Sequence, residues 1–166
     1  MAYISLPHFG SIESSSLEEY YETIITFNGI KIKIDLNFEN KTSEPDRLQT
    51  VKNFIENIRI YDLNNKGYIN DDYTDAEADT VKSYLAYHLE ELGGDELSDL
   101  IDTGSKSIDH EKQLLKKLHL VRVGIYPNNK GPFAAFDYSI GPEITAYLIV
   151  VNTDENGNLD YLTMER

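Results

Sequence analysis

The sequence contains no cysteine and no tryptophan among its 166 residues. Without a thiol, the chain cannot form a disulfide, a thiolate zinc site or a cysteine nucleophile. It shows neither a basic and apolar leader nor a run of about 18 apolar residues, so we expect no signal peptide and no membrane span. These absences predict a soluble, cytoplasmic protein that does not associate with membranes.

Positive charge is also scarce, because 15 Lys and Arg residues stand against 29 Asp and Glu residues, for a net charge of −14. Such a chain lacks the basic face that follows nucleic-acid phosphates, which excludes a nucleic-acid binder. A hydrophobic content of 40% and a charged content of 27% are typical of globular proteins. The length predicts a single domain over residues 1–166, and we find no repeat or long linker that would divide it.

The clearest local signal is the Asn-Gly dipeptide at 28–29. Such a pair accepts the positive φ angles of a type I′ turn, which joins two strands through two residues. The turn separates residues 23–27 from residues 30–38, where every even position is apolar. This period of two predicts a hairpin with one buried face, on which Phe27 lies opposite Ile30.

Helical periodicity dominates the middle of the chain. Ser43 is placed to cap a helix with Pro45 in its first turn. Its apolar residues recur at steps of three and four: Leu48, Val51, Phe54, Ile55 and Ile58. A capping box at 74–77 predicts the start of a second helix, which ends at the glycines at 93–94.

The apolar stripe predicted for this second helix contains Ala78, Val81, Leu85, His88 and Leu92, with Tyr84 and Leu89 beside it. Two shorter helices are predicted at about residues 95–102 and 107–118. In the second of these, at 107–118, Leu114, Leu115 and Leu118 are expected to face inward.

Strand-like periodicity returns in the last third of the chain. Alternating segments at 119–126, 133–139, 146–152 and 159–164 are joined by short loops rich in Gly, Pro, Asn and Asp. Short loops favour antiparallel neighbours. The order of strands, helices and strands predicts an α+β fold, in which the N-terminal hairpin and a C-terminal four-strand meander form a mainly antiparallel sheet. About four helices pack on one face of that sheet.

Acidic residues concentrate between positions 71 and 102. This segment contains Asp71, Asp72, Asp75, Glu77, Asp79, Glu90, Glu91, Asp95, Glu96, Asp99 and Asp102, with Lys82 as its single basic residue. The next segment, with Lys106, Lys112, Lys116, Lys117 and Arg122, is mildly basic. Most charge runs are solvated surfaces that keep a protein soluble. The alternative is an acidic helical face that docks a basic protein partner.

The acidic face supports the leading functional hypothesis, a non-enzymatic protein-interaction module, with an immunity protein or toxin inhibitor as one version. Self-association through an exposed sheet edge stays open, because the sequence does not decide the oligomeric state.

Residues 62–73 partly match a calcium loop. Four positions agree with the pattern, namely Asp62, Asn64, Gly67 and Asn70. Two positions disagree, because Lys66 occupies position five and Tyr73 replaces the bidentate glutamate at position twelve. We therefore favour a simple connection between two helices. A degenerate cation-binding loop is the alternative function, and no other cofactor is predicted.

Catalytic signatures are missing from the sequence. None of the four histidines, His8, His88, His110 and His119, forms a zinc-hydrolase motif, and no nucleophile elbow occurs. His88 lies on an apolar stripe, which favours a hydrogen-bonded residue at the edge of the core. An enzyme whose site is assembled from distant residues stays as a further alternative.

Three C-terminal segments, LHLVRVGIYP at 118–127, FDYSIG at 136–141 and VVNTDENGNL at 150–159, resemble a bacterial family, the domain of unknown function two-thousand-and-four. The segments IDLNF at 34–38 and HLEEL at 88–92 are similar to the same family. The resemblance implies a small bacterial α+β domain and supplies no catalytic residues. Within these segments, Arg122, Asp137 and Asp154 are the polar candidates for a site, and they are equally suited to strand pairing and turns.

Overall fold

The computed structural model describes residues 3–166. Within that range, β1 (Tyr3–Leu6) and β2 (Gly10–Glu13) form a two-stranded sheet. A six-stranded sheet contains β3 (Tyr20–Phe27), β4 (Ile30–Asn37), β5 (His119–Ile125), β6 (Ala134–Ser139), β7 (Leu148–Thr153) and β8 (Leu159–Glu165). The helices are α1 (Pro45–Glu56), α2 (Ile58–Thr74), α3 (Thr80–Glu91), α4 (Gly94–Leu100) and α5 (His110–Leu115).

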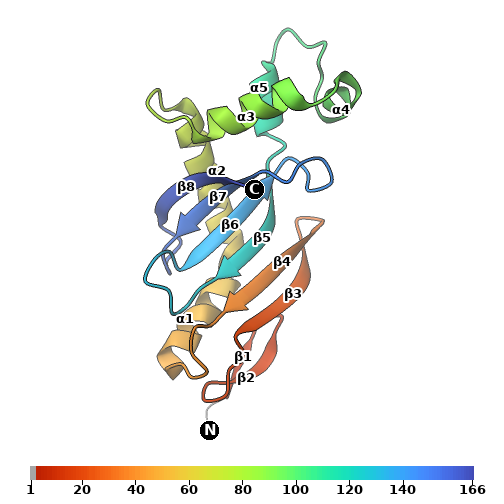
Figure 1. The fold of residues 1–166 in the computed structure, drawn as a ribbon. Coiled ribbons are helices and arrows are strands. Elements are labelled where there is room, and N and C mark those ends of the chain that lie inside the picture. Colours follow the sequence, from red (N-terminus) through yellow and green to blue (C-terminus); the bar gives the residue numbers. More distant parts are fainter. Residues whose placement is uncertain (1–2) are drawn as a thin grey trace.

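The strands of the larger sheet follow one another in chain order (Figure 1). Only β4 and β5 pair in parallel, and every other neighbouring pair of this sheet in residues 3–166 is antiparallel. A parallel pair needs a long crossover, and all of the helices described in residues 3–166 lie in the segment between β4 and β5. The predicted α+β class, with its hairpin and its C-terminal meander, is confirmed.

The hairpin of β3 and β4 forms as the Asn-Gly dipeptide predicts. Asn28 and Gly29 have φ angles of 51° and 78°, and Phe27 lies opposite Ile30. Phe27 is buried and belongs to the core, whereas Ile30 is exposed. The expected turn and register are therefore confirmed, and the expected burial of Ile30 is wrong.

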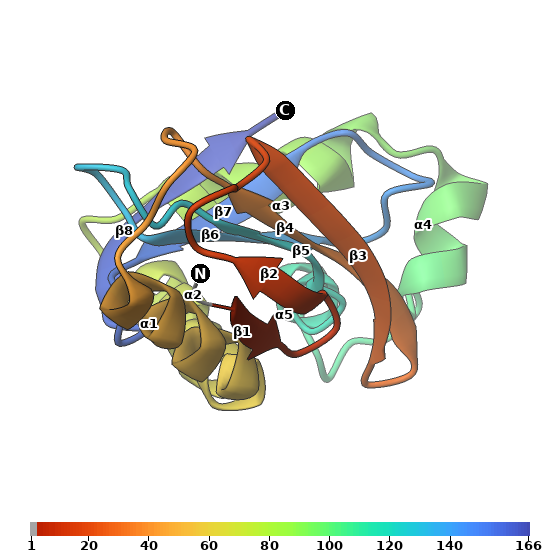
Figure 2. The ribbon, with the colours of Figure 1, turned by 90° about the horizontal axis from the view of Figure 1, so that it is seen from below.

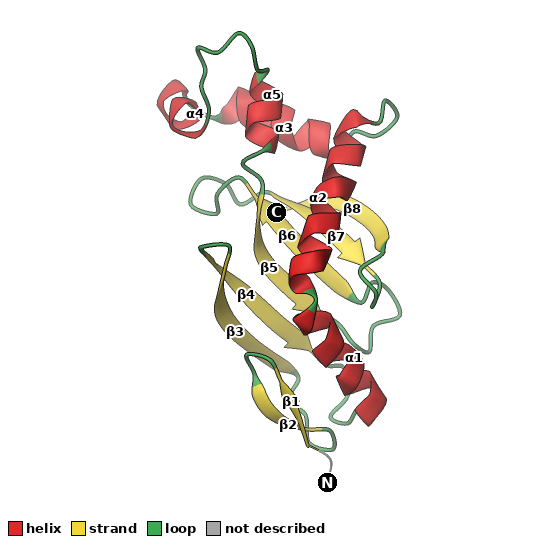
Figure 3. Cartoon of the chain, turned by 180° about the vertical axis from the view of Figure 1, so that it is seen from behind, coloured by secondary structure: helices red, strands yellow, loops and turns green. Residues whose placement is uncertain are grey.

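The core lies between one face of the six-stranded sheet and the helices α1 and α2. Figure 3 shows these two helices following one another along that face, with α3, α4 and α5 gathered at one end of the sheet. Val51 and Phe54 of α1 are fully buried, as are Val123 of β5 and Phe136 of β6. The rings of Phe54 and Phe136 lie 5.8 Å apart. The period-two strands and the helical stripe therefore share one core.

The small sheet of β1 and β2 was not expected from the sequence. Figure 2 shows it on the same side of the large sheet as α1, and its Leu6 and Ile12 side chains belong to the core. Its turn places His8 at a φ of 71°, although most residues with positive φ are glycine or asparagine. Four-residue strands with an atypical turn leave little signal in the sequence.

The helix boundaries correct two predictions. Glu44, and not Ser43, is the N-cap of α1, and it forms no side-chain capping bond. Thr74 ends α2, so the expected capping box at 74–77 does not begin a helix; α3 begins at Thr80. The larger correction concerns residues 62–73, which form most of α2 and neither a calcium loop nor a connection between helices. Packing of α2 on the sheet outweighs the turn-forming tendency of its Asn and Gly residues.

The apolar stripes were predicted more accurately than the ends of the helices. Val81, Tyr84, Leu85 and His88 are the buried residues of α3. The predicted helices at 95–102 and 107–118 are the shorter elements α4 and α5. Leu114 and Leu118 are buried as expected, and Leu115 is partly buried.

Substitution of Gly67 tests the helical state of residues 62–73. A Cβ atom at Gly67 meets nothing within 4 Å, so Gly67→Ala should raise the free energy of unfolding by about 1 kcal/mol through helix propensity. In a calcium loop the same position bends sharply, and alanine would destabilise the protein. Gly157→Ala is the opposite control: its φ is 77° and its Cβ would collide with the Tyr61 ring, so stability should fall by at least about 2 kcal/mol. Urea unfolding measures both.

Candidate functional site

The acidic residues predicted to form one helical face occupy the end of α2, the α2–α3 connection, the end of α3, and α4 with its following loop. Asp71, Asp72, Asp75, Glu77 and Asp79 precede α3. Glu90, Glu91, Asp95, Glu96, Asp99 and Asp102 lie at and beyond its C-terminal end. A 12-residue helix is about 18 Å long. The segment thus forms two acidic groups, one at each end of α3.

These carboxylates are exposed, except for the half-buried Asp72. Four of them have local structural roles, because they accept hydrogen bonds from nearby backbone amides. Asp72 accepts from Val81, Asp75 from Glu77, Glu96 from Gly93 and Asp102 from Gly104. Throughout residues 3–166, the carboxylates that form ion pairs are those of Glu22, Asp35, Asp62, Asp137 and Glu155. The acidic segment therefore has no positive charge paired with it in the described chain.

A second polar cluster lies on the sheet face opposite α1 and α2, which the described helices leave uncovered in Figure 1. Arg122 of β5 binds the Asp35 carboxylate of β4 through two hydrogen bonds, from Nε at 2.7 Å and from Nη2 at 2.8 Å. Nη1 donates to Asp137 of β6 at 3.3 Å, and Nη2 also donates to the Tyr126 hydroxyl at 2.9 Å. One guanidinium thus connects three neighbouring strands.

The geometry of this cluster depends on Gly124, which lies two residues beyond Arg122 on the same face. A Cβ atom at Gly124 would approach Arg122 Nη2 to 2.5 Å, so only glycine leaves room for the guanidinium. Asp35 is completely buried. The sequence singled out Arg122 and Asp137 but missed Asp35, although its outward position in the alternating strand at 30–38 was the available signal.

Burial and hydrogen bonding set the pKa values in the cluster. Burial raises the pKa of the Asp137 carboxyl, and the neighbouring Arg122 charge opposes that effect only in part. Burial alone would lower the pKa of Arg122, but the bonds to Asp35 and Tyr126 outweigh it and the pKa is raised. A small cavity of about 350 Å³ adjoins the cluster. Because its guanidinium is already bonded to protein groups, Arg122 serves first to hold the strands together.

The residues of the calcium interpretation do not converge on one point. Asp62 points into the core, where it accepts a hydrogen bond from the Tyr138 hydroxyl at 2.6 Å. Asn64, Gly67 and Asn70 are exposed on α2. Helical spacing distributes the four positions around the helix axis. In the part of the chain that the structure describes, no three His, Asp or Glu side chains are grouped to hold a metal ion.

His88 is a hydrogen-bonded residue at the edge of the core, as expected. Its Nδ1 lies 2.7 Å from the Tyr84 carbonyl oxygen and its Nε2 lies 2.8 Å from the Thr145 hydroxyl. A carbonyl can only accept, so Nδ1 carries the proton and Nε2 accepts from Thr145. Burial lowers the pKa of His88. No carboxylate is bonded to its ring among residues 3–166, so the arrangement contains no acid–base pair.

Asp154, the third polar candidate, organises the turn between β7 and β8. Its Oδ1 accepts hydrogen bonds from the amides of Asn156 at 2.8 Å and Asn158 at 2.9 Å. Burial would raise the pKa of Asp154, but these bonds outweigh it and the pKa is lowered. The segment is the hairpin turn that its Asn and Gly content predicts.

In comparisons with known proteins, the chain matches no family model, no curated protein and no solved structure. The resemblance to the domain of unknown function two-thousand-and-four stays a prediction. No helix in residues 3–166 has both the length and the apolar character needed to cross a membrane.

The role of Arg122 in holding the strands is testable by stability. Arg122→Gln leaves the fully buried Asp35 carboxylate without a positive partner, so the free energy of unfolding should fall by about 3–5 kcal/mol. Lys33→Gln is the matched control, because Lys33 forms an exposed pair with Glu22 at 4.0 Å and its loss should change stability by less than about 1 kcal/mol. Equal effects of the two substitutions in urea unfolding would contradict the assignment.

His88 should make stability depend on pH. Its folded-state pKa lies below the unfolded value of about 6.5, so the unfolded chain takes up a proton that the folded protein resists. Neutral His88 makes its full contribution to the free energy of unfolding above about pH 6.5, and this contribution is lost progressively as the pH falls below that value. His88→Gln should reduce the decrease in unfolding free energy between about pH 7 and 5. His8→Asn, at an exposed position, should keep the wild-type slope.

Proposed function

We propose that this protein is a non-enzymatic interaction module that binds a basic protein through the α3–α4 end of the molecule. The observation that carries the proposal is the group of exposed carboxylates that have no cationic partner within residues 3–166. Concentrated negative potential accelerates the encounter with a positively charged protein and disfavours acidic competitors. An inhibitor that covers a basic surface of its target is one form of this function.

Of the two acidic groups, the one at the C-terminal end of α3 is the better candidate for the contact surface. Asp72, Asp75 and Asp79 lie where the chain turns into α3, and Asp72 and Asp75 accept hydrogen bonds from backbone amides there. By contrast, the side chains of Glu90, Glu91, Asp95 and Asp99 form no hydrogen bond or ion pair with other residues of the described chain and are exposed. They are free to meet cations on a partner.

The test compares two variants of equal net charge. The first, Glu90→Gln/Glu91→Gln/Asp95→Asn/Asp99→Asn, removes four charges from the α3–α4 end. The second, Glu39→Gln/Glu56→Gln/Glu143→Gln/Asp160→Asn, removes four exposed charges elsewhere. Each is used as bait in an extract of the source organism. A partner should be captured by the wild type and the second variant and be lost with the first.

Ionic strength supplies the second readout. Binding of the captured protein, once purified, should weaken by about tenfold or more between 50 and 300 mM salt, since the Debye length falls over this range. A partner that both variants bind equally, or whose affinity is insensitive to salt, would exclude the charge-led interaction.

A further inference from the structure

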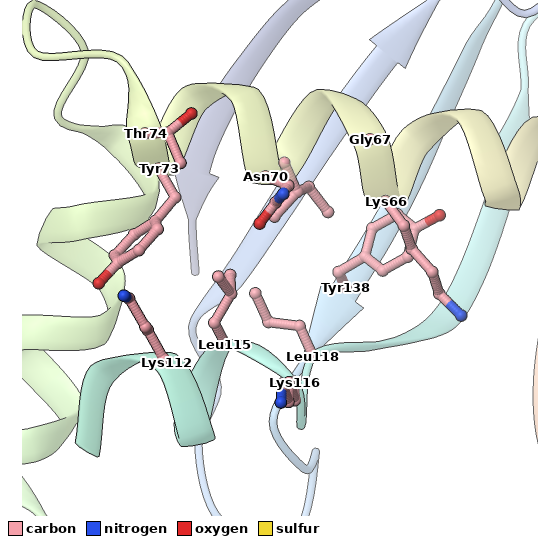
Figure 4. A pocket seen from close by; sticks show the side chains of 11 residues that line it. Lys66, Gly67, Asn70, Tyr73, Thr74, Lys112, Leu115, Lys116, Leu118 and Tyr138 are labelled. Atoms are coloured by element: carbon pink, nitrogen blue, oxygen red, sulfur yellow. The ribbon is translucent and has the colours of Figure 1, made fainter. Parts of the chain in front are cut away.

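A cavity of about 580 Å³ opens between α2, α5 and β6 (Figure 4), and none of the acidic residues around the ends of α3 lines it. Residues of α2 form one wall, and α5 with the turn that follows it forms the opposite wall. The volume falls within the range of about 300–1,000 Å³ that is usual for small-molecule sites. Neither the calcium interpretation nor the acidic surface accounts for this cavity.

The floor of the cavity is apolar. It contains Ile69 of α2, Leu115 and Leu118 at the α5 end, and the ring of Tyr138 from β6. The Tyr138 hydroxyl donates to the buried Asp62 at 2.6 Å, which fixes the orientation of the ring. A floor held in this way is formed before any ligand arrives, so it can accept an apolar body without rearrangement.

Gly67 keeps the α2 wall open. It lines the cavity in the interior of a helix, where glycine is unfavourable, and a Cβ atom added there would meet nothing within 4 Å. A larger side chain at this position would therefore extend into free space. Gly67 therefore contributes no side chain to the lining of the cavity.

The charge of the lining is opposite to that of the whole protein. Lys66, Lys112 and Lys116 line the cavity and no acidic residue does, although the chain has a net charge of −14. Lys66 lies 3.4 Å from the Asp62 carboxylate, whereas Lys112 and Lys116 form no ion pair in residues 3–166. Two ammonium groups on the α5 side thus remain available for an anion.

Uncharged donors face the same lysines. Figure 4 shows Lys112 extending from α5 toward the Tyr73 hydroxyl of α2, with Asn70 one turn nearer the floor. Neither the Asn70 amide nor the Tyr73 hydroxyl is hydrogen bonded to another residue of the described chain. Burial, followed by the negative charges of Glu111 and Asp109, raises the pKa of Tyr73, so its hydroxyl is protonated and able to donate near neutral pH. An acid group at the rim would find charged and neutral donors together.

We propose that this cavity binds a small amphipathic carboxylic acid. Its hydrocarbon chain lies on the floor of Ile69, Leu115, Leu118 and Tyr138, and its carboxylate meets Lys112 and Lys116 at the rim. An apolar body without an acid group would leave the two ammonium groups unpaired. A fully polar anion would leave the apolar floor in contact with water. This proposal is independent of the protein partner proposed above.

The first experiment is isothermal titration calorimetry with three decyl compounds at concentrations below micelle formation. Sodium decanoate should bind at one site. Decan-1-ol should bind about tenfold more weakly, because it lacks charge-assisted hydrogen bonds. Decyltrimethylammonium should not bind in the cavity, although the net charge of the protein attracts cations. Absence of decanoate binding, or equal binding of decyltrimethylammonium at the decanoate site, would overturn the proposal.

Two variants locate the site. Lys112→Gln/Lys116→Gln should weaken decanoate binding by about tenfold, and the charge-matched control Lys41→Gln/Lys130→Gln should not change it, since those lysines lie outside the cavity. Gly67→Leu should fill the cavity and abolish binding while the protein stays folded, because the added side chain enters open space. Circular dichroism and thermal unfolding check the fold. Unaltered affinity in either cavity variant would show that decanoate binds elsewhere.

Discussion

Burial of one apolar face of the six-stranded sheet under α1 and α2 is the constraint on which the remaining structure depends. The two sheet segments are separated by the whole helical region, yet β4 and β5 lie side by side in parallel. That pairing is possible because the connecting chain returns across the sheet as helices. Phe54 and Tyr61, whose ring centroids are 4.7 Å apart, join α1 and α2 within this layer. The polar clusters therefore lie on the surfaces that this layer does not cover.

The uncovered sheet face shows one consequence. Every second residue of β4, β5 and β6 must point away from the core, and on this face Asp35, Arg122 and Asp137 come together. Their side chains are largely buried even though no described helix covers them, so the charges must be paired within the cluster. The guanidinium spans β4, β5 and β6, which reinforces the single parallel junction of the sheet.

A second consequence is the separation of opposite charges near the helical end. The acidic groups lie around the ends of α3, where side chains are exposed and separated by the length of the helix. The lysines of α5 lie beside α2, where they border an apolar floor. The first arrangement suits a broad contact with a cationic surface, and the second suits a single anionic group attached to hydrocarbon. The two proposed functions therefore occupy different surfaces.

Local patterns predicted the strands of the six-stranded sheet, the apolar stripes of the helices and the turns at 28–29 and 154–158, but not β1 and β2. These features depend on neighbours in sequence, so the residues themselves carry the signal. The boundaries of α2 and α3 were less accurate, because the composition of residues 62–73 favours turns while burial of Asp62, Asn65 and Ile69 requires a helix.

Neither the partners of Asp35 nor the lining of the cavity could be found from sequence spacing. Asp35 and Arg122 are 87 residues apart in the sequence, and Tyr138 is 76 residues from Asp62, its hydrogen-bond partner in α2. The amino-acid sequence alone determined the strands of the large sheet, the apolar stripes of the helices, the α+β class and the excess of negative charge, since each follows from local periodicity or composition. Only the tertiary structure decided which charges are paired and where two lysines face an apolar floor, because those contacts depend on how the helices fold back over the sheet.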